Sequence, residues 1–172
     1  MEDNERYIYE VIKDMYERSL NDANDIIARA QNPLAATSVI IAVLVYLAPK
    51  VYEFPKLTLE NAFVLGGFYL SLFATLLCMG LTCYYLIRGF KPGGYVYKNI
   101  GSPDEIISLL KQDKLWSVIK RYKLATEYNS QINSIRMVYI RKATETIILA
   151  VAFSFPCGFM YCIIASILGL NR

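Results

Sequence analysis

Charged residues are missing from three long stretches of the chain. No Asp, Glu, Lys or Arg occurs in residues 30–49, 61–87 or 146–171, which are 20, 27 and 26 residues long. A helix needs about 20 mostly apolar residues to cross the hydrocarbon core of a bilayer. The pattern therefore predicts three transmembrane helices, at about 33–49, 61–87 and 146–170.

The segment before the first predicted span has the pattern of an amphipathic helix. Its apolar residues recur every three or four positions, as a helix with one apolar stripe requires. The stripe consists of Ile8, Ile12, Met15, Tyr16, Leu20, Ala23, Ile27 and Ala30. Pro33 follows, and we expect a new helix start or a kink there.

A second polar segment, residues 88–142, separates the last two predicted spans. Ser102-Pro103 supplies an N-cap residue followed by Pro at the first helical position, and two acidic residues come next. These are helix-start signals. We expect a short helix to about Gln112 and a long helix from about Lys114 that continues into the third span.

The sequence thus predicts an all-α integral membrane protein. It has three transmembrane helices, an N-terminal amphipathic helix, and a long cytoplasmic helix continuing into the last span. The expected regions are an acidic helix at 1–32, a transmembrane hairpin at 33–87, a basic helical region at 88–142 and a C-terminal transmembrane helix at 143–172.

Charge predicts the orientation. Residues 88–142 carry eleven Lys and Arg against four acidic residues, whereas the loop 50–60 carries two Lys and two Glu. Lys and Arg are enriched in cytoplasmic loops. We therefore expect a multi-pass protein with residues 88–142 and the N-terminus in the cytoplasm.

The two polar segments have opposite charge, −4 for residues 1–32 and +7 for residues 88–142. An anionic membrane surface would repel the acidic segment, so a protein partner suits it better. The two segments either face each other, within a subunit or between subunits, or are separate solvated surfaces.

The sequence offers little for catalysis or metal binding. It contains no His, no GxSxG or phosphate-loop motif, and its four Cys lie inside predicted spans at spacings unlike those of zinc sites. We expect neither an enzyme nor a bound cofactor or metal ion.

Small residues line one face of each of the last two spans. They recur every three or four positions, which lets helices approach closely in lipid. The candidate packing residues are Gly67, Ser71, Ala74, Cys78, Ala150, Ser154 and Gly158. These faces either pack, within or between subunits, or line a wet path with their hydroxyl groups.

A polar seam runs along the long helix before the third span. Thr126, Asn129, Asn133 and Arg136 alternate in steps of three and four, which is heptad spacing. Buried Asn at such positions fixes register and oligomer number. The seam is a candidate oligomer contact or pore vestibule, and a solvated helix face is the alternative.

Basic residues flank this seam. The candidates for binding an anionic lipid or a phosphate-bearing ligand are Lys120, Arg121, Lys123, Arg141 and Lys142. Juxtamembrane basic residues are attracted to anionic lipid, and Arg and Lys also suit phosphate groups.

The layout resembles that of small membrane effectors of bacterial anti-phage defence, in particular SLATT-type effectors of nucleotide-signalling operons. The shared features are the N-terminal helix ending at Asn32-Pro33, the hairpin of two spans, and SPDEIISLLKQDKLWSVIKRYKLATEYNSQIN before a last span. A typical SLATT layout has two spans, and this sequence predicts a third.

The resemblance implies a homo-oligomer in the bacterial inner membrane. Such a protein forms a pore or ion channel and depolarises or permeabilises the host membrane in abortive infection, after a trigger that is often a nucleotide or oligonucleotide made by a partner enzyme. The alternative is a non-conducting, membrane-anchored adaptor that docks a cytoplasmic partner.

Overall fold

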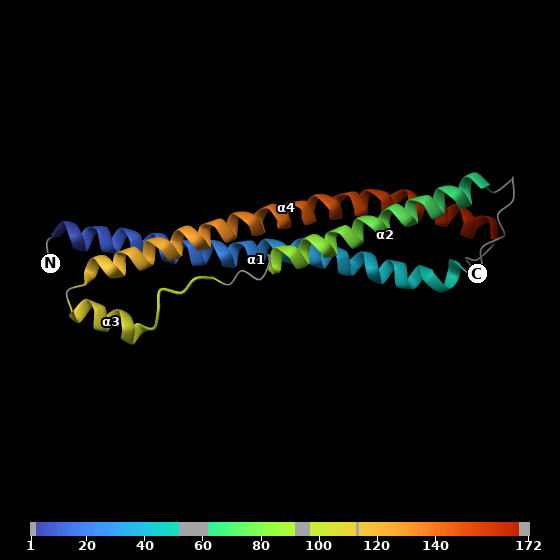
Figure 1. The fold of residues 1–172 in the computed structure, drawn as a ribbon. Coiled ribbons are helices and arrows are strands. Elements are labelled where there is room, and N and C mark those ends of the chain that lie inside the picture. Colours follow the sequence, from blue (N-terminus) through green and yellow to red (C-terminus); the bar gives the residue numbers. More distant parts are fainter. Residues whose placement is uncertain (1–2, 52–61, 92–96, 113, 169–172) are drawn as a thin grey trace. The chain divides into compact units, whose positions relative to one another are not determined.

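The computed structural model describes residues 3–51, 62–91, 97–112 and 114–168. Within them the chain forms four helices and no strand, which confirms the all-α prediction (Figure 1). The helices are α1 (Asp3–Val51), α2 (Ala62–Phe90), α3 (Pro103–Lys111) and α4 (Leu115–Leu168).

Three of these helices, α1, α2 and α4, are long and apolar enough to cross a membrane. Each covers all or most of one of the charge-free stretches. A helix suits an apolar stretch in lipid because it bonds its backbone groups internally. The protein therefore has the composition of a membrane protein with three candidate spans.

The new helix start that the sequence allowed at Pro33 is absent, since α1 continues through this residue. Proline removes one N–H group from the helical ladder, and its carbonyl remains available. The Thr37 hydroxyl donates to the Pro33 carbonyl at 2.7 Å, and Pro33 is buried. The amphipathic segment and the first candidate span are thus one helix of 49 residues.

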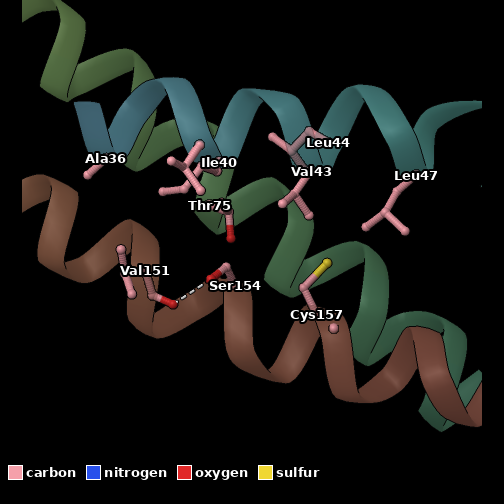
Figure 2. A pocket seen from close by; sticks show the side chains of 11 residues that line it. Ala36, Ile40, Val43, Leu44, Leu47, Thr75, Val151, Ser154 and Cys157 are labelled. Carbon is pink, nitrogen blue, oxygen red and sulfur yellow. Dashed lines mark hydrogen bonds between the residues drawn. The ribbon is translucent and has the colours of Figure 1, made fainter. Parts of the chain in front are cut away.

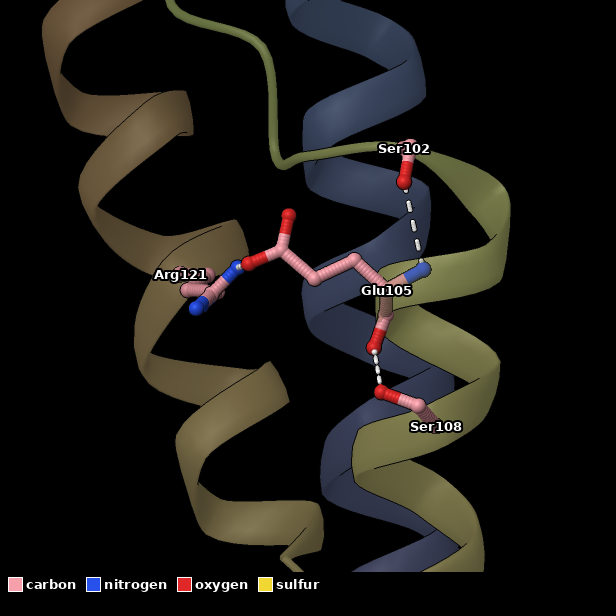
Figure 3. A network of polar contacts seen from close by, with 4 residues as sticks. All are labelled: Ser102, Glu105, Ser108 and Arg121. Carbon is pink, nitrogen blue, oxygen red and sulfur yellow. Dashed lines mark hydrogen bonds and ion pairs between the residues drawn. The ribbon is translucent and has the colours of Figure 1, made fainter.

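The start of α3 is as predicted. The Ser102 hydroxyl accepts a bond from the Glu105 N–H at 3.2 Å, and Pro103 takes the first helical position (Figure 3). Just before the cap, Gly101 has φ +119°, a conformation that L side chains rarely adopt. Local sequence therefore sets both the turn and the helix that follows it.

The chain divides into two compact units, each of which is described by itself. The head unit comprises Met1–Arg29 and Arg88–Tyr139, and the span unit comprises Ala30–Ile87 and Ile140–Arg172. The boundaries at 29/30 and 87/88 fall where charge-free stretches begin or end, whereas the boundary at 139/140 lies six residues before the last charge-free stretch.

The head unit has an apolar core between α1, α3 and α4. Tyr122 of α4 packs edge-on against Tyr9 and Tyr16 of α1, with ring centroids 5.9 and 5.4 Å apart. Val118 and Ala125 are fully buried in the same cluster. The acidic and basic segments therefore do meet within one chain, and this part of the contact between them is apolar.

Charged residues take little part in that contact. The described ion pairs of α1 are all internal to it, at i,i+4 spacing: Arg6–Glu10, Lys13–Glu17 and Asp14–Arg18. The buried face of α1 follows Tyr16, Ser19, Ala23, Ile26 and Ala30. Met15 and Ile27, which the sequence placed in the stripe, are 52% and 43% exposed.

The span unit packs α1, α2 and α4 around two clusters. One contains Ile40, Cys78, Met79, Ile147 and Ala150, and the other contains Leu65, Phe68, Cys157 and Ile164. Pro156 lies inside α4 and interrupts its hydrogen-bond ladder. The outward faces of these helices remain apolar and exposed, as lipid contact requires.

Candidate functional site

The polar seam of α4 lies against the chain segment that precedes α3, which we call the strap (residues 97–102). Asn129 is fully buried, and its side-chain oxygen accepts from the Lys98 N–H at 2.9 Å. Its side-chain nitrogen donates to the Lys98 carbonyl at 3.4 Å. One amide thus satisfies both polar backbone groups of a single strap residue, as a neighbouring strand would.

Asn133, one turn further along, joins α4 to α1 and to the strap. Its side-chain nitrogen donates to the Ser19 carbonyl at 2.7 Å, and its oxygen accepts a bond from the Tyr97 hydroxyl. Ser19 is itself buried, and its hydroxyl donates to the Tyr16 carbonyl at 2.7 Å. Because buried polar groups are costly without partners, this satisfied set favours one arrangement of the three segments.

Arg136 completes the row and reaches the end of α2. Its Nη1 donates to the Tyr97 hydroxyl at 2.7 Å, and its Nη2 donates to the Phe90 carbonyl at 3.3 Å. The guanidinium carbon also lies 4.6 Å from the centre of the Tyr97 ring. Phe90 is the last residue of α2, so this cation meets the negative end of a helix dipole.

Tyr97 is the hub of this row. Burial raises the pKa of the Tyr97 hydroxyl, while the charge and hydrogen bond of Arg136 act in the opposite direction and only partly offset it. The phenol is therefore protonated at neutral pH. It can donate to Asn133 and accept from Arg136 at the same time, as the geometry requires.

The four residues Tyr97, Asn129, Asn133 and Arg136 form what we call the polar lock. All its described contacts are made within one head unit, and they tie the strap, α1 and the end of α2 to α4. One donor of the lock is unsatisfied: the buried Nε of Arg136 has no hydrogen-bond partner among the described residues. In this conformation the Asn side chains face the strap.

Thr126, the first residue of the seam, lies outside the lock. It lines a groove of about 240 Å³ together with Ile12, Met15, Lys123 and Glu127. Its hydroxyl is buried and, among the described residues, has no hydrogen-bond partner. The seam is thus divided between the polar lock and an open groove.

The candidate basic residues belong to both units. In the head unit, Lys120 and Lys123 are exposed, and Arg121 pairs with Glu105 at 2.6 Å (Figure 3). In the span unit, Arg141 pairs with Glu145 at 3.0 Å, and Lys142 lies 5.7 Å from the centre of the Tyr85 ring. The five residues therefore do not constitute one site within either unit.

The small-residue faces pack within the span unit. Ser71 and Cys78 are buried, Ala74 is half-buried, and a Cβ added at Gly67 would lie 3.2 Å from Met160 Cε. Ala150 is fully buried. Thr82 and Thr146 also form a hydrogen bond of 2.9 Å between α2 and α4. These contacts are of the close kind that small residues allow in lipid.

Part of the α4 face borders an unfilled groove. Ser154 and Gly158 line it with residues of α1 and with Thr75 of α2, and its volume is about 340 Å³ (Figure 2). The Thr75 and Ser154 hydroxyls donate to the carbonyls of Ser71 and Val151, at 2.8 and 2.6 Å. The groove is otherwise aliphatic, so it suits an apolar occupant.

Sequence reasoning singled out Asn129, Asn133 and Arg136 but missed Tyr97 and Ser19. Tyr97 lies 36 residues before Asn133, in a segment without helical periodicity. No spacing rule connects the two positions. The only signal was the presence of three polar residues in core positions of a heptad, which implies that a polar partner must exist somewhere.

Neither family models, curated proteins nor solved structures give a match to this chain. Among the described residues, no group of three or more His, Cys, Asp or Glu is placed to hold a metal ion.

Proposed function

We propose that the chain is an oligomeric membrane effector that forms a pore or ion channel and depolarises or permeabilises the bacterial inner membrane in anti-phage defence. Three helices are too few to enclose a water-filled path, so a pore needs several copies. The proposal places the head unit and the N-terminus in the cytoplasm, where the Lys and Arg of residues 88–142 favour them.

The observation that carries this proposal is the groove of the span unit. The chain leaves about 340 Å³ unfilled between α1 and α4, and this space borders the small-residue face of α4. In lipid, helices associate through close packing and not through a hydrophobic drive. A helix of a second copy in this groove would complete the packing and bring the Thr75 and Ser154 hydroxyls to a subunit boundary.

The polar lock supplies a candidate gate. Arg136 holds the last carbonyl of α2, so release of the lock would free the end of a candidate span. The trigger expected from the resemblance is a nucleotide or oligonucleotide made by a partner enzyme, and it remains a prediction.

The test is the native mass of the protein in nanodiscs, followed by conductance in planar bilayers. Gly158→Leu fills the groove, yet a Cβ at this position meets nothing within 4 Å inside the chain. We expect this variant to lower the subunit number and the conductance. Gly80→Leu, at a second helical glycine with no neighbour within 4 Å, is the matched control.

The outcomes separate clearly. A monomeric wild type, or a defined oligomer that conducts nothing, would contradict the pore proposal. Gly158→Leu with unchanged mass and conductance would remove the groove from the subunit contact.

A membrane-anchored adaptor is the second candidate function. The exposed apolar side chains Tyr7, Val11 and Met15 on the head part of α1 favour it, because they offer a protein-binding surface. If the spans can be exchanged for unrelated transmembrane helices without loss of activity, the adaptor function is favoured over the pore function.

A further inference from the structure

Arg136 is a half-buried cation whose partners are all neutral. Its guanidinium bonds to the Tyr97 hydroxyl and to the Phe90 carbonyl. The ion pairs among the described residues join other side chains, and the exposed Asp22 and Asp25 of α1 do not pair with it either. A charge that is partly removed from water is normally balanced by an opposite charge. Within the described part of the head unit, this guanidinium has no such balance.

One edge of the same guanidinium is poorly used. Its Nε is buried without a hydrogen-bond partner among the described residues, and its Nη2 makes a bond of 3.3 Å to the Phe90 carbonyl. That bond is longer than the usual N–H···O distance of about 2.9–3.0 Å. Nε and Nη2 lie on one edge of the guanidinium, and two such N–H groups match two oxygens of a phosphate or a carboxylate. The edge therefore suits a bidentate anion, while Nη1 remains on the Tyr97 hydroxyl.

The two chain segments that meet at Arg136 favour an anion by their charge. Residues 88–103 carry Arg88, Lys91 and Lys98 and no acidic residue, and residues 128–139 carry Arg136 and no acidic residue. The formal charge of the two segments is therefore +4. An excess of one sign of charge raises the local concentration of ions of the opposite sign. A phosphate ester with about −1.5 to −2 charges at neutral pH is attracted more strongly than a carboxylate.

We propose that the Nε–Nη2 edge of Arg136 binds a phosphate group, which takes the place of the Phe90 carbonyl. The exchange replaces one long bond to a neutral acceptor by two charge-assisted bonds, and such bonds are shorter and about twice as strong. The bond from Nη1 to Tyr97 is kept, whereas the last residue of α2 loses its tie to α4. Binding at this site does not depend on the pore, but its effect as a trigger rests on the function proposed above.

Two sources can supply the phosphate group. Phe90 lies three residues past the charge-free stretch of α2, which is about 4.5 Å along a helix. A lipid headgroup can therefore reach this level. A soluble phosphate or phosphate ester is the other source, and it offers the same oxygens to the same edge of the guanidinium. The experiment separates the two sources.

The experiment follows the Nε–H groups of the full chain by nuclear magnetic resonance, with arginine labelled by nitrogen-15. The protein is held in maltoside micelles, which contain no phosphate. Inorganic phosphate is added in one titration and phosphatidylglycerol in another, each at constant ionic strength. We expect the Arg136 signal, assigned by its loss in Arg136→Lys, to shift until it saturates. The Arg141 signal is the internal control and should stay in place, because Glu145 already binds its Nε at 3.0 Å.

Two variants test the role of the fork by calorimetric titration with inorganic phosphate. Arg136→Lys keeps the charge but has no paired N–H groups, so the affinity should fall by about tenfold. Arg141→Lys, whose side chain is 80% exposed, is the matched control and should bind phosphate as the wild type does. Circular dichroism checks that the helices persist in both. If Arg136→Lys does not fold, the titration of the wild-type Nε signal decides alone.

A saturating shift of the Arg136 signal supports the site, and the additive that causes it at the lower concentration identifies the source as soluble or lipid. An unchanged signal with both additives overturns the site. So does an equal shift with sodium chloride or sodium acetate, or an equal loss of affinity in Arg136→Lys and Arg141→Lys.

Conductance in planar bilayers separates the site from the pore. If the Arg136 signal shifts but the wild type conducts nothing, the phosphate site stands and the proposed pore is wrong. If the wild type conducts and the additive that shifts the signal leaves the conductance unchanged, the site stands and its role as a trigger is overturned.

Discussion

The Asn129 side chain pairs with the backbone of Lys98 through both of its polar atoms, the oxygen at 2.9 Å from the N–H and the nitrogen at 3.4 Å from the carbonyl. The Asn129 side chain thus bonds to the strap as the backbone of a neighbouring strand would, and holds the strap against α4. Its buried position makes this bond pair one of the most sensitive points of the head unit.

Asn129→Leu should loosen the strap. The Lys98 N–H and carbonyl would lose their partner, and an unsatisfied buried polar group costs about 1–3 kcal/mol. Hydrogen exchange of the 97–102 segment should accelerate by about tenfold or more. Gln131→Leu, at an exposed position of the same helix, should leave it unchanged. Equal exchange rates in the two variants would show that the pair contributes nothing.

The double variant Asn129→Leu, Asn133→Leu tests the lock as a gate. It removes the hydrogen bonds that the two Asn side chains make to the Lys98 backbone, the Tyr97 hydroxyl and the Ser19 carbonyl, while Arg136 keeps its bond to Tyr97. We expect a changed subunit number or a loss of conductance in bilayers. If assembly and activity match the wild type, the polar lock has no part in gating.

Arg136→Lys should behave as a disruptive change despite keeping the charge. The guanidinium places one nitrogen on the Tyr97 hydroxyl and another on the Phe90 carbonyl, and an ammonium cannot reproduce this fork. We expect a loss of about 1–2 kcal/mol in unfolding free energy, measured by thermal unfolding in detergent. Arg141→Lys, whose side chain is 80% exposed, is the control and should change stability by much less.

Gly101→Ala should destabilise the start of α3. At φ +119° a Cβ is strained, and it would lie 2.8 Å from Glu105 Oε2. Such strain costs about 1–3 kcal/mol. Gly80→Ala, with nothing within 4 Å of the added Cβ, should be tolerated. Chemical unfolding of both variants measures the difference, and equal stabilities would contradict the strain.

Alkaline pH should weaken the polar lock through Tyr97. Its pKa in the folded chain is raised above the ordinary 10.0, chiefly by burial. The protonated phenol is therefore favoured by folding, and its contribution is present below pH 10 and lost as pH rises through the folded pKa. The midpoint temperature of unfolding should fall as the pH rises above about 10. This fall should be smaller in Tyr97→Phe than in Tyr7→Phe, which removes an exposed hydroxyl and serves as the control. Parallel falls in both variants would exclude Tyr97 as the cause.

The helices were readable from sequence because their signals are local. A charge-free stretch of 20 residues or more and the Ser102-Pro103 cap each report on neighbours in the chain. Pro33 misled for the same reason: its local preference allowed a new helix start there, but α1 extends far on both sides of it and tolerates one missing N–H.

The sequence predicted the α4 residues of the polar lock but not their partners. Heptad spacing marked Asn129, Asn133 and Arg136, since three polar residues at core positions demand an explanation. Their partners lie 31 to 114 residues away in sequence. That pairing depends on the path of a non-helical segment, which no periodicity encodes.

The recognition of Lys98 through its backbone has a consequence for sequence variation. Its side chain is exposed and, among the described contacts, plays no part in the lock. Evolution can exchange residue 98 freely, apart from proline, which would remove the N–H. Position 97 is constrained instead, because Tyr97 must both give and receive a hydrogen bond. In diverging copies of this gene, position 98 should therefore vary while the adjacent position 97 stays Tyr. Asn129 should also persist, because no side chain at position 98 can replace its bonds to the backbone.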